Sequence, residues 1–148
     1  MSQQLQDELG SALSTVLHDM QHATDQLTRA LEAEWLALGS GNTEALDQVG
    51  TRKLTLMTQM EQLDAERLQL NREIPAWATV QEPAWTRIEL SLRHCQKLNQ
   101  RNGSMVTRRL HQVREALSIL AGQGEKNGVY SRNGELHVSL HSRALAEA

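Results

Sequence analysis

Apolar residues recur every three or four positions along the first part of the chain. They are Leu5, Leu9, Leu13, Val16, Met20, Ala23, Leu27, Leu31, Trp35 and Leu38. This spacing is close to the 3.5-residue period of a coiled coil and predicts one amphipathic helix over about 2–38. The segment from Gly39 to Asn42 should end it, because two glycines and two short polar residues favour a helix end and a new N-cap.

A second helix is predicted over about 43–74. Its apolar stripe consists of Leu46, Val49, Leu56, Met60, Leu63, Leu70 and Ile74. Lys53 and Arg67 stand in the same stripe, where long cationic side chains can lie along apolar surface and keep their heads in water. Pro75 should end the helix, because the residue before a proline is pushed out of the α region. We expect residues 75–83 to form a connection.

A third helix is predicted over about 84–121. Its stripe consists of Trp85, Ile88, Leu92, Cys95, Asn99, Asn102, Val106, Val113, Leu117 and Leu120. Asn99 and Asn102 occupy positions where a helical bundle normally has leucine, and Gly103 follows directly. A buried asparagine fixes helix register at a cost in stability, and glycine lowers helix propensity by roughly 1 kcal/mol. The asparagines therefore face a partner helix, either one of this chain or one of another protein.

The character of the chain changes at Gly122, where glycines become frequent. Residues 122–148 are predicted to be a flexible C-terminal tail with little regular structure or a short helix. The predicted fold is all-α, with three long antiparallel helices over 1–121 that form an elongated bundle or coiled coil, followed by this tail.

Composition and charge narrow the function classes. The chain has no Phe, one Tyr and three Trp, which favours narrow helix–helix seams over a thick core. The net charge of −3 is spread out without a basic block, so nucleic acid is not an expected partner. No apolar run approaches the ~18 residues of a membrane span, and the lone Cys95 excludes a disulfide within the chain. We expect a cytoplasmic protein that does not insert into a membrane.

Catalytic and metal-binding constellations are not apparent in the sequence. His18 and His22 have the spacing of two ligands on one helix face, and His137 and His141 repeat it, but neither pair stands in an HExxH frame. No Glu has a His three residues later, which a di-iron bundle needs. We expect no enzyme activity, no metal and no cofactor.

Two short motifs resemble those of a known family. They are Leu98–Gly103, with the sequence LNQRNG, and Tyr130–Gly134, with the sequence YSRNG. The first motif lies within the predicted third helix, and the second follows that helix. In this layout the chain resembles the FlgN family of flagellar type III export chaperones. The resemblance covers the whole chain in layout.

The resemblance implies a cytoplasmic chaperone for flagellar hook–filament junction proteins. Such a chaperone would bind their C-terminal amphipathic segments, prevent premature assembly and deliver them to the cytoplasmic domain of the export gate. The surplus apolar stripe of the third helix suits capture of an added helix. The client-binding candidates are Leu98, Asn99, Asn102, Gly103, Met105, Val106, Leu110, Val113, Leu117 and Leu120. By resemblance, Tyr130 and Gly134 are the candidates for docking on the gate.

The alternative is a structural coiled-coil or scaffold protein. Its long helices would assemble with copies of themselves or with another coiled-coil protein, giving a stable oligomer without a client. Asn99 and Asn102 would then serve only to fix register.

Overall fold

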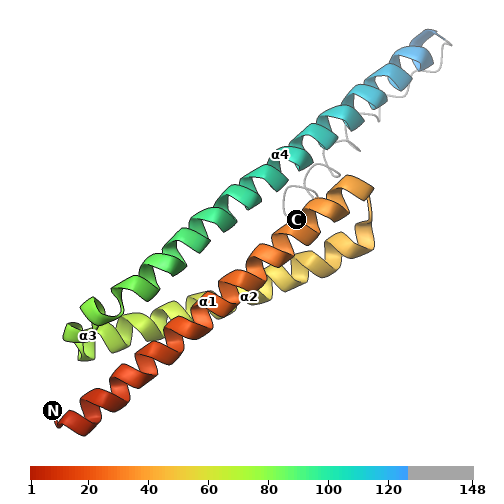
Figure 1. Cartoon of the computed structure of the whole chain (residues 1–148). Coiled ribbons are helices and arrows are strands. Elements are labelled where there is room, and N and C mark those ends of the chain that lie inside the picture. The colour runs from red at the N-terminus through yellow and green to blue at the C-terminus, as the bar shows by residue number, and fades with distance from the viewer. Residues whose placement is uncertain (127–148) are drawn as a thin grey trace. The chain divides into compact units, whose positions relative to one another are not determined.

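The computed structural model describes residues 1–126, and every regular element among them is a helix. The helices are α1 (Gln3–Ser40), α2 (Thr43–Glu73), α3 (Pro75–Val80) and α4 (Glu82–Lys126), as Figure 1 shows. The all-α prediction is confirmed for this part of the chain. None of the described helices combines the length and the apolar character that crossing a membrane requires.

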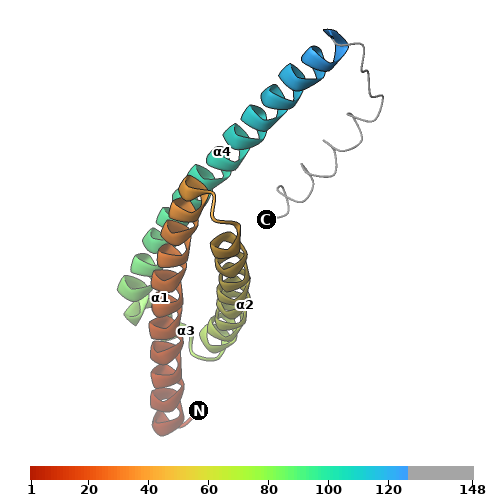
Figure 2. The ribbon, with the colours of Figure 1, turned by 90° about the vertical axis from the view of Figure 1, so that its right-hand side faces the viewer.

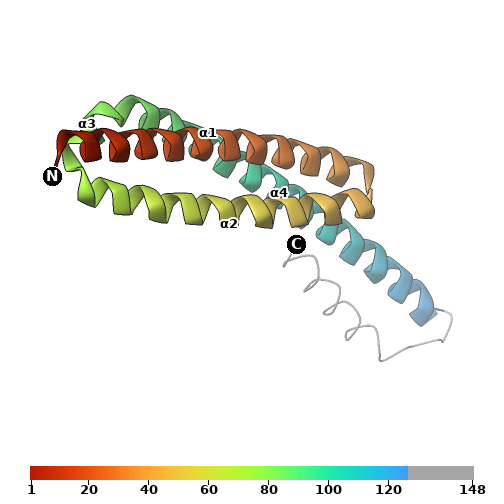
Figure 3. The same ribbon diagram turned by 90° about the horizontal axis from the view of Figure 1, so that it is seen from below.

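The turn between α1 and α2 lies where the glycines predict it. Gly41 adopts the left-handed conformation, with φ of 68°, and its position ends α1. Asn42 then caps α2, because its side-chain oxygen accepts a hydrogen bond of 3.1 Å from the backbone N–H of Ala45. The two helices consequently run side by side in opposite directions (Figure 3).

The connection predicted over 75–83 was wrong in part, because Pro75–Val80 forms the short helix α3. Helix α2 ends at Glu73, and Ile74 caps it before Pro75. Pro75 also occupies the first turn of α3, where a missing N–H costs nothing and a fixed φ helps. A proline can thus stop one helix and start the next.

Helix α4 is longer at both ends than the predicted 84–121, and it continues through Gly122 to Lys126. The first residues of the predicted tail are therefore helical. The remaining tail residues, with both gate-docking candidates Tyr130 and Gly134, lie outside the described residues.

The chain falls into two units, one of residues 1–100 and one that begins at Arg101. The first unit contains α1, α2, α3 and the first part of α4 (Figure 2). Side chains from these helices pack into one apolar core. Its buried members are Leu13, Val16, Leu17, Met20, Leu70, Ile74 and Ile88. A smaller cluster joins Leu31 of α1 to Cys95 and Leu98 of α4. Burial of about 1.5–3 kcal/mol per large apolar side chain makes these clusters the main source of stability.

Two tryptophans make specific contacts between helices of this unit. An ideal Cβ atom on Gly10 would lie 2.6 Å from the ring of Trp77, so α3 can rest on α1 only because residue 10 has no side chain. The Arg67 guanidinium lies 3.8 Å from the centroid of the Trp85 ring and also pairs with Asp64. Arg67 therefore lies on an aromatic face instead of simply reaching water.

Candidate functional site

The LNQRNG motif of α4 begins at the core of the first unit. Leu98 is buried against Leu31 and Cys95, and this placement follows from its spacing of three residues from Cys95. Leu98 was predicted to contact a client, but its side chain is already used in the chain's own core. We therefore leave it out of the candidate surface.

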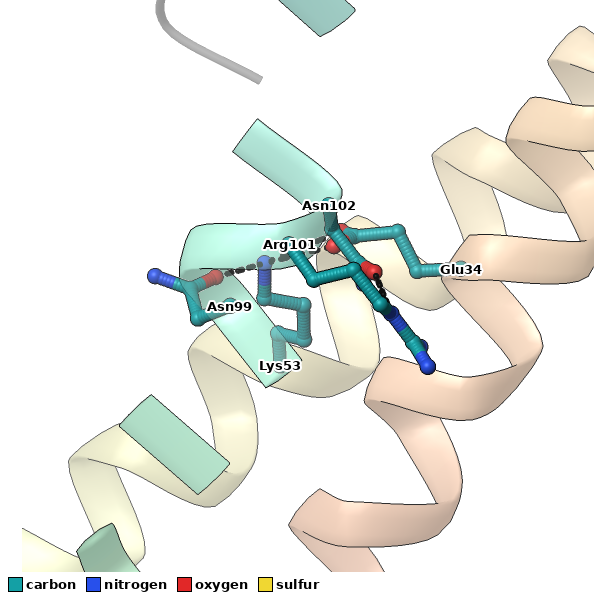
Figure 4. Close-up of polar contacts among 5 residues, drawn as sticks. All are labelled: Glu34, Lys53, Asn99, Arg101 and Asn102. Carbon is teal, nitrogen blue, oxygen red and sulfur yellow. Dashed lines mark hydrogen bonds and ion pairs between the residues drawn. The ribbon is translucent and has the colours of Figure 1, made fainter. Parts of the chain in front are cut away.

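Asn99 takes part in a polar cluster that joins three helices of the first unit. Lys53 of α2 donates hydrogen bonds to both carboxylate oxygens of Glu34 in α1, at 2.9 and 3.2 Å. The same ammonium donates to Oδ1 of Asn99 in α4, at 3.1 Å (Figure 4). The Lys53 ammonium is therefore held by contacts within the chain and is only slightly exposed. Asn99 has a contact within the chain that suits the role of fixing register.

Asn102 and Gly103 belong to the second unit and differ in their surroundings. Asn102 is buried, and its side-chain oxygen accepts a hydrogen bond of 3.2 Å from Nε of Arg101 (Figure 4). Gly103 is exposed, and a Cβ atom built on it would meet nothing within 4 Å in the structure.

Beyond Gly103, α4 carries an apolar face that becomes more exposed toward its end. Met105, Val106 and Leu110 are half-buried, whereas Val113, Leu117 and Leu120 are 53 %, 43 % and 63 % exposed. We call Val106, Leu110, Val113, Leu117 and Leu120 the α4 stripe. At 3.6 residues per turn these five residues fall within an arc of about 80° on the helix. Met105 lies beside this arc.

The α4 stripe is the surface of the second unit that we consider for binding another helix. Single exposed apolar residues are common, but a helical stripe of them marks a surface that another helix can cover. The side of α4 away from the stripe is mixed: it carries an ion pair of 3.2 Å between His111 and Glu115 and the exposed Ile119.

The described residues show no arrangement for catalysis or metal binding. No group of three His, Cys, Asp or Glu side chains within residues 1–126 could hold a metal ion. His137 and His141 lie outside this range. A hollow of about 630 Å³ between α1 and the start of α4 is lined by His18 and Arg87, but no carboxylate lines it.

Cys95 is a free and buried thiol. Burial raises the pKa of the Cys95 thiol, and the hydrogen-bonding contact with Thr28 at 3.2 Å opposes this only in part. A thiol that ionises with difficulty is a weak nucleophile, so Cys95 serves packing.

Comparison with known proteins decides the family. The family model described as FlgN protein matches residues 9–137. The chain belongs to the FlgN family. This match includes both LNQRNG and YSRNG, and it confirms the resemblance that those motifs carry. FlgN is the flagellar export chaperone family and is not a family of enzymes.

Membership in the FlgN family gives the α4 stripe its context, since a chaperone needs a surface for its client. No curated protein matches the chain, and no solved structure matches it. Among the large apolar client-binding candidates, the exposed ones are Val113, Leu117 and Leu120 at the end of the α4 stripe. Tyr130 and Gly134 lie within the matched residues.

Proposed function

We propose that this chain binds the C-terminal amphipathic segments of flagellar hook–filament junction proteins in the cytoplasm, keeps them unassembled and delivers them to the export gate. The observation that carries the proposal is the exposed α4 stripe on a helix of a FlgN-family chain. An amphipathic client helix with apolar residues at positions i, i+3, i+4 and i+7 would fit along it.

The size of the stripe suits a client that must be released. Full burial of one large apolar side chain contributes about 1.5–3 kcal/mol. Val113, Leu117 and Leu120 are already partly covered, and association itself costs several kcal/mol. The net affinity of this surface is therefore moderate, which suits binding before export and dissociation at the gate.

The stripe is tested by a matched pair of charged substitutions. Leu117→Asp places a carboxylate within the exposed end of the stripe, while Ser118→Asp places one on the next, exposed residue outside the stripe. We expect Leu117→Asp to reduce secretion of hook–filament junction proteins at unchanged chaperone level, and Ser118→Asp to leave it normal. Normal secretion by Leu117→Asp would contradict the proposal.

Delivery is tested separately by removing residues 127–148. This truncation leaves all four helices in place, whereas a truncation at 122 would shorten α4. We expect the truncated chain to bind its client and to fail in secretion, because Tyr130 and Gly134 are proposed to dock on the gate. Normal secretion would show that delivery does not need these residues.

The scaffold alternative makes a different prediction for the same stripe, because an exposed helical stripe also suits self-association. Light scattering on the purified chain over a range of concentrations separates the two functions. A stable oligomer that Leu117→Asp dissociates would assign the stripe to self-assembly. A monomer that binds the client would support the chaperone.

A further inference from the structure

Helix α2 of the first unit has a second apolar face, on its exposed side. Leu54, Met57 and Leu68 are 68 %, 49 % and 42 % exposed, and Glu61 and Ala65 between them are exposed as well. We call these five residues the α2 stripe. Their steps of three and four residues keep them within an arc of about 80°, along about 21 Å of helix.

This stripe is separate from the face with which α2 packs into the bundle. The bundle face carries Leu56, Met60, Leu63 and Leu70, which are buried or half-buried. At about 100° per residue the two faces point in nearly opposite directions. The α2 stripe is therefore not part of the core of its own unit, and all of its residues belong to the first unit.

The surface next to the stripe suits the close approach of another helix. Leu54, Thr55, Thr58, Gln59 and Gln62 line a shallow hollow of about 530 Å³. None of these side chains is charged, so a partner covering them would not strip water from an ion. Threonine and glutamine can also hydrogen-bond at the edge of a helix–helix contact.

Glu61 decides which kind of helix fits. It stands seven residues after Leu54 and seven before Leu68, at the centre of the stripe. If a second copy of α2 packed here in antiparallel register, Leu54 would face Leu68 of the copy and Glu61 would face its own counterpart. A parallel register also brings the two Glu61 carboxylates together. Like charges in apposition weaken association, so the stripe disfavours a second copy of itself.

We propose that the α2 stripe docks an amphipathic helix of another protein that presents a Lys or Arg to Glu61. Its apolar residues would match Leu54, Met57 and Leu68, and its cation would pair with the central carboxylate. A charged residue within an apolar seam selects the partner and its register. This surface is distinct from the α4 stripe and does not depend on the proposed function.

The test uses two synthetic amphipathic peptides, each about three heptads long, with leucines spaced to match the stripe. One carries Lys at the central position and the other carries Glu, and the two are otherwise identical. Binding to the full chain is followed by fluorescence anisotropy. We expect the Lys peptide to bind at least about tenfold more tightly than the Glu peptide. In Glu61→Lys the order of the two affinities should reverse.

Two further variants assign this preference to α2. Leu54→Asp should remove binding of the Lys peptide, and circular dichroism should show an unchanged helix content because Leu54 is exposed. Leu117→Asp, which disrupts the α4 stripe, should leave the order of the affinities unchanged. Equal binding of the two peptides, or an order that Glu61→Lys does not alter, would overturn the proposal. A dimer of the wild-type chain that Leu54→Asp dissociates would also overturn it, because the occupant would then be a second copy.

Discussion

The ammonium of Lys53 lies 2.9 Å from the carboxylate of Glu34, and only 16 % and 10 % of these two side chains is exposed. The residues come from α2 and α1 and are 19 positions apart in the chain. Asn99 of α4 accepts a third hydrogen bond from the same ammonium. One cation therefore sets the alignment of three helices in the first unit.

Removal of Lys53 should destabilise the protein more than removal of an exposed charge. Lys53→Met leaves the Glu34 carboxylate without this cation in a site that is largely shielded from water. We expect the free energy of unfolding to fall by about 1–3 kcal/mol, between the values for exposed and buried pairs. Urea denaturation of Lys53→Met, Glu34→Gln and the double variant measures the coupling. Strictly additive effects would show that the ion pair contributes nothing.

Gly10 and Gly103 should respond oppositely to alanine. Gly10→Ala forces a methyl group against the Trp77 ring, and such overpacking costs about 1–3 kcal/mol. Gly103→Ala meets open space inside a helix, so it should raise helix stability by up to ~1 kcal/mol. Thermal unfolding of the two variants checks this. A neutral Gly10→Ala would contradict the contact between α1 and α3.

Alkaline pH should destabilise the first unit through Cys95. Burial raises the pKa of this thiol in the folded state, so the unfolded chain releases the proton at lower pH. The stability that the buried neutral thiol contributes is present below the ordinary thiol pKa of about 8.5 and declines as pH rises above it. Denaturation at pH 8 and at pH 10 should show a loss that is smaller in Cys95→Ala. An equal loss in both proteins would contradict this explanation.

Much of the fold is predictable from the spacing of apolar residues. The pattern from Leu5 to Leu38 locates α1, and the run from Gly39 to Asn42 supplies both the left-handed Gly41 and the cap of α2. The apolar spacing does not predict helix α3, because the pattern around Pro75 indicates only the end of the preceding helix. A proline does not by itself say whether a new helix starts at it.

The contacts between helices could not be predicted, because they depend on how the helices align. Periodicity places Lys53 in a seam but does not show that Glu34 lies opposite it. It also gives no signal for Trp77 on Gly10 or for Arg67 on Trp85. For the candidate site, the spacing identifies the α4 stripe but cannot separate the buried Leu98 from the exposed Leu117.

The central claim is that the α4 stripe binds the client, and calorimetry tests it most directly. The purified C-terminal segment of a hook–filament junction protein is titrated into the full wild-type chain, Leu117→Asp and Ser118→Asp. Leu117 is 43 % exposed, so a client covers less than half of its side chain. The lost apolar contact together with the cost of covering a carboxylate should weaken binding to Leu117→Asp by at least about tenfold. Binding to Ser118→Asp should equal that of the wild type. Equal affinity of Leu117→Asp and the wild type would contradict the claim.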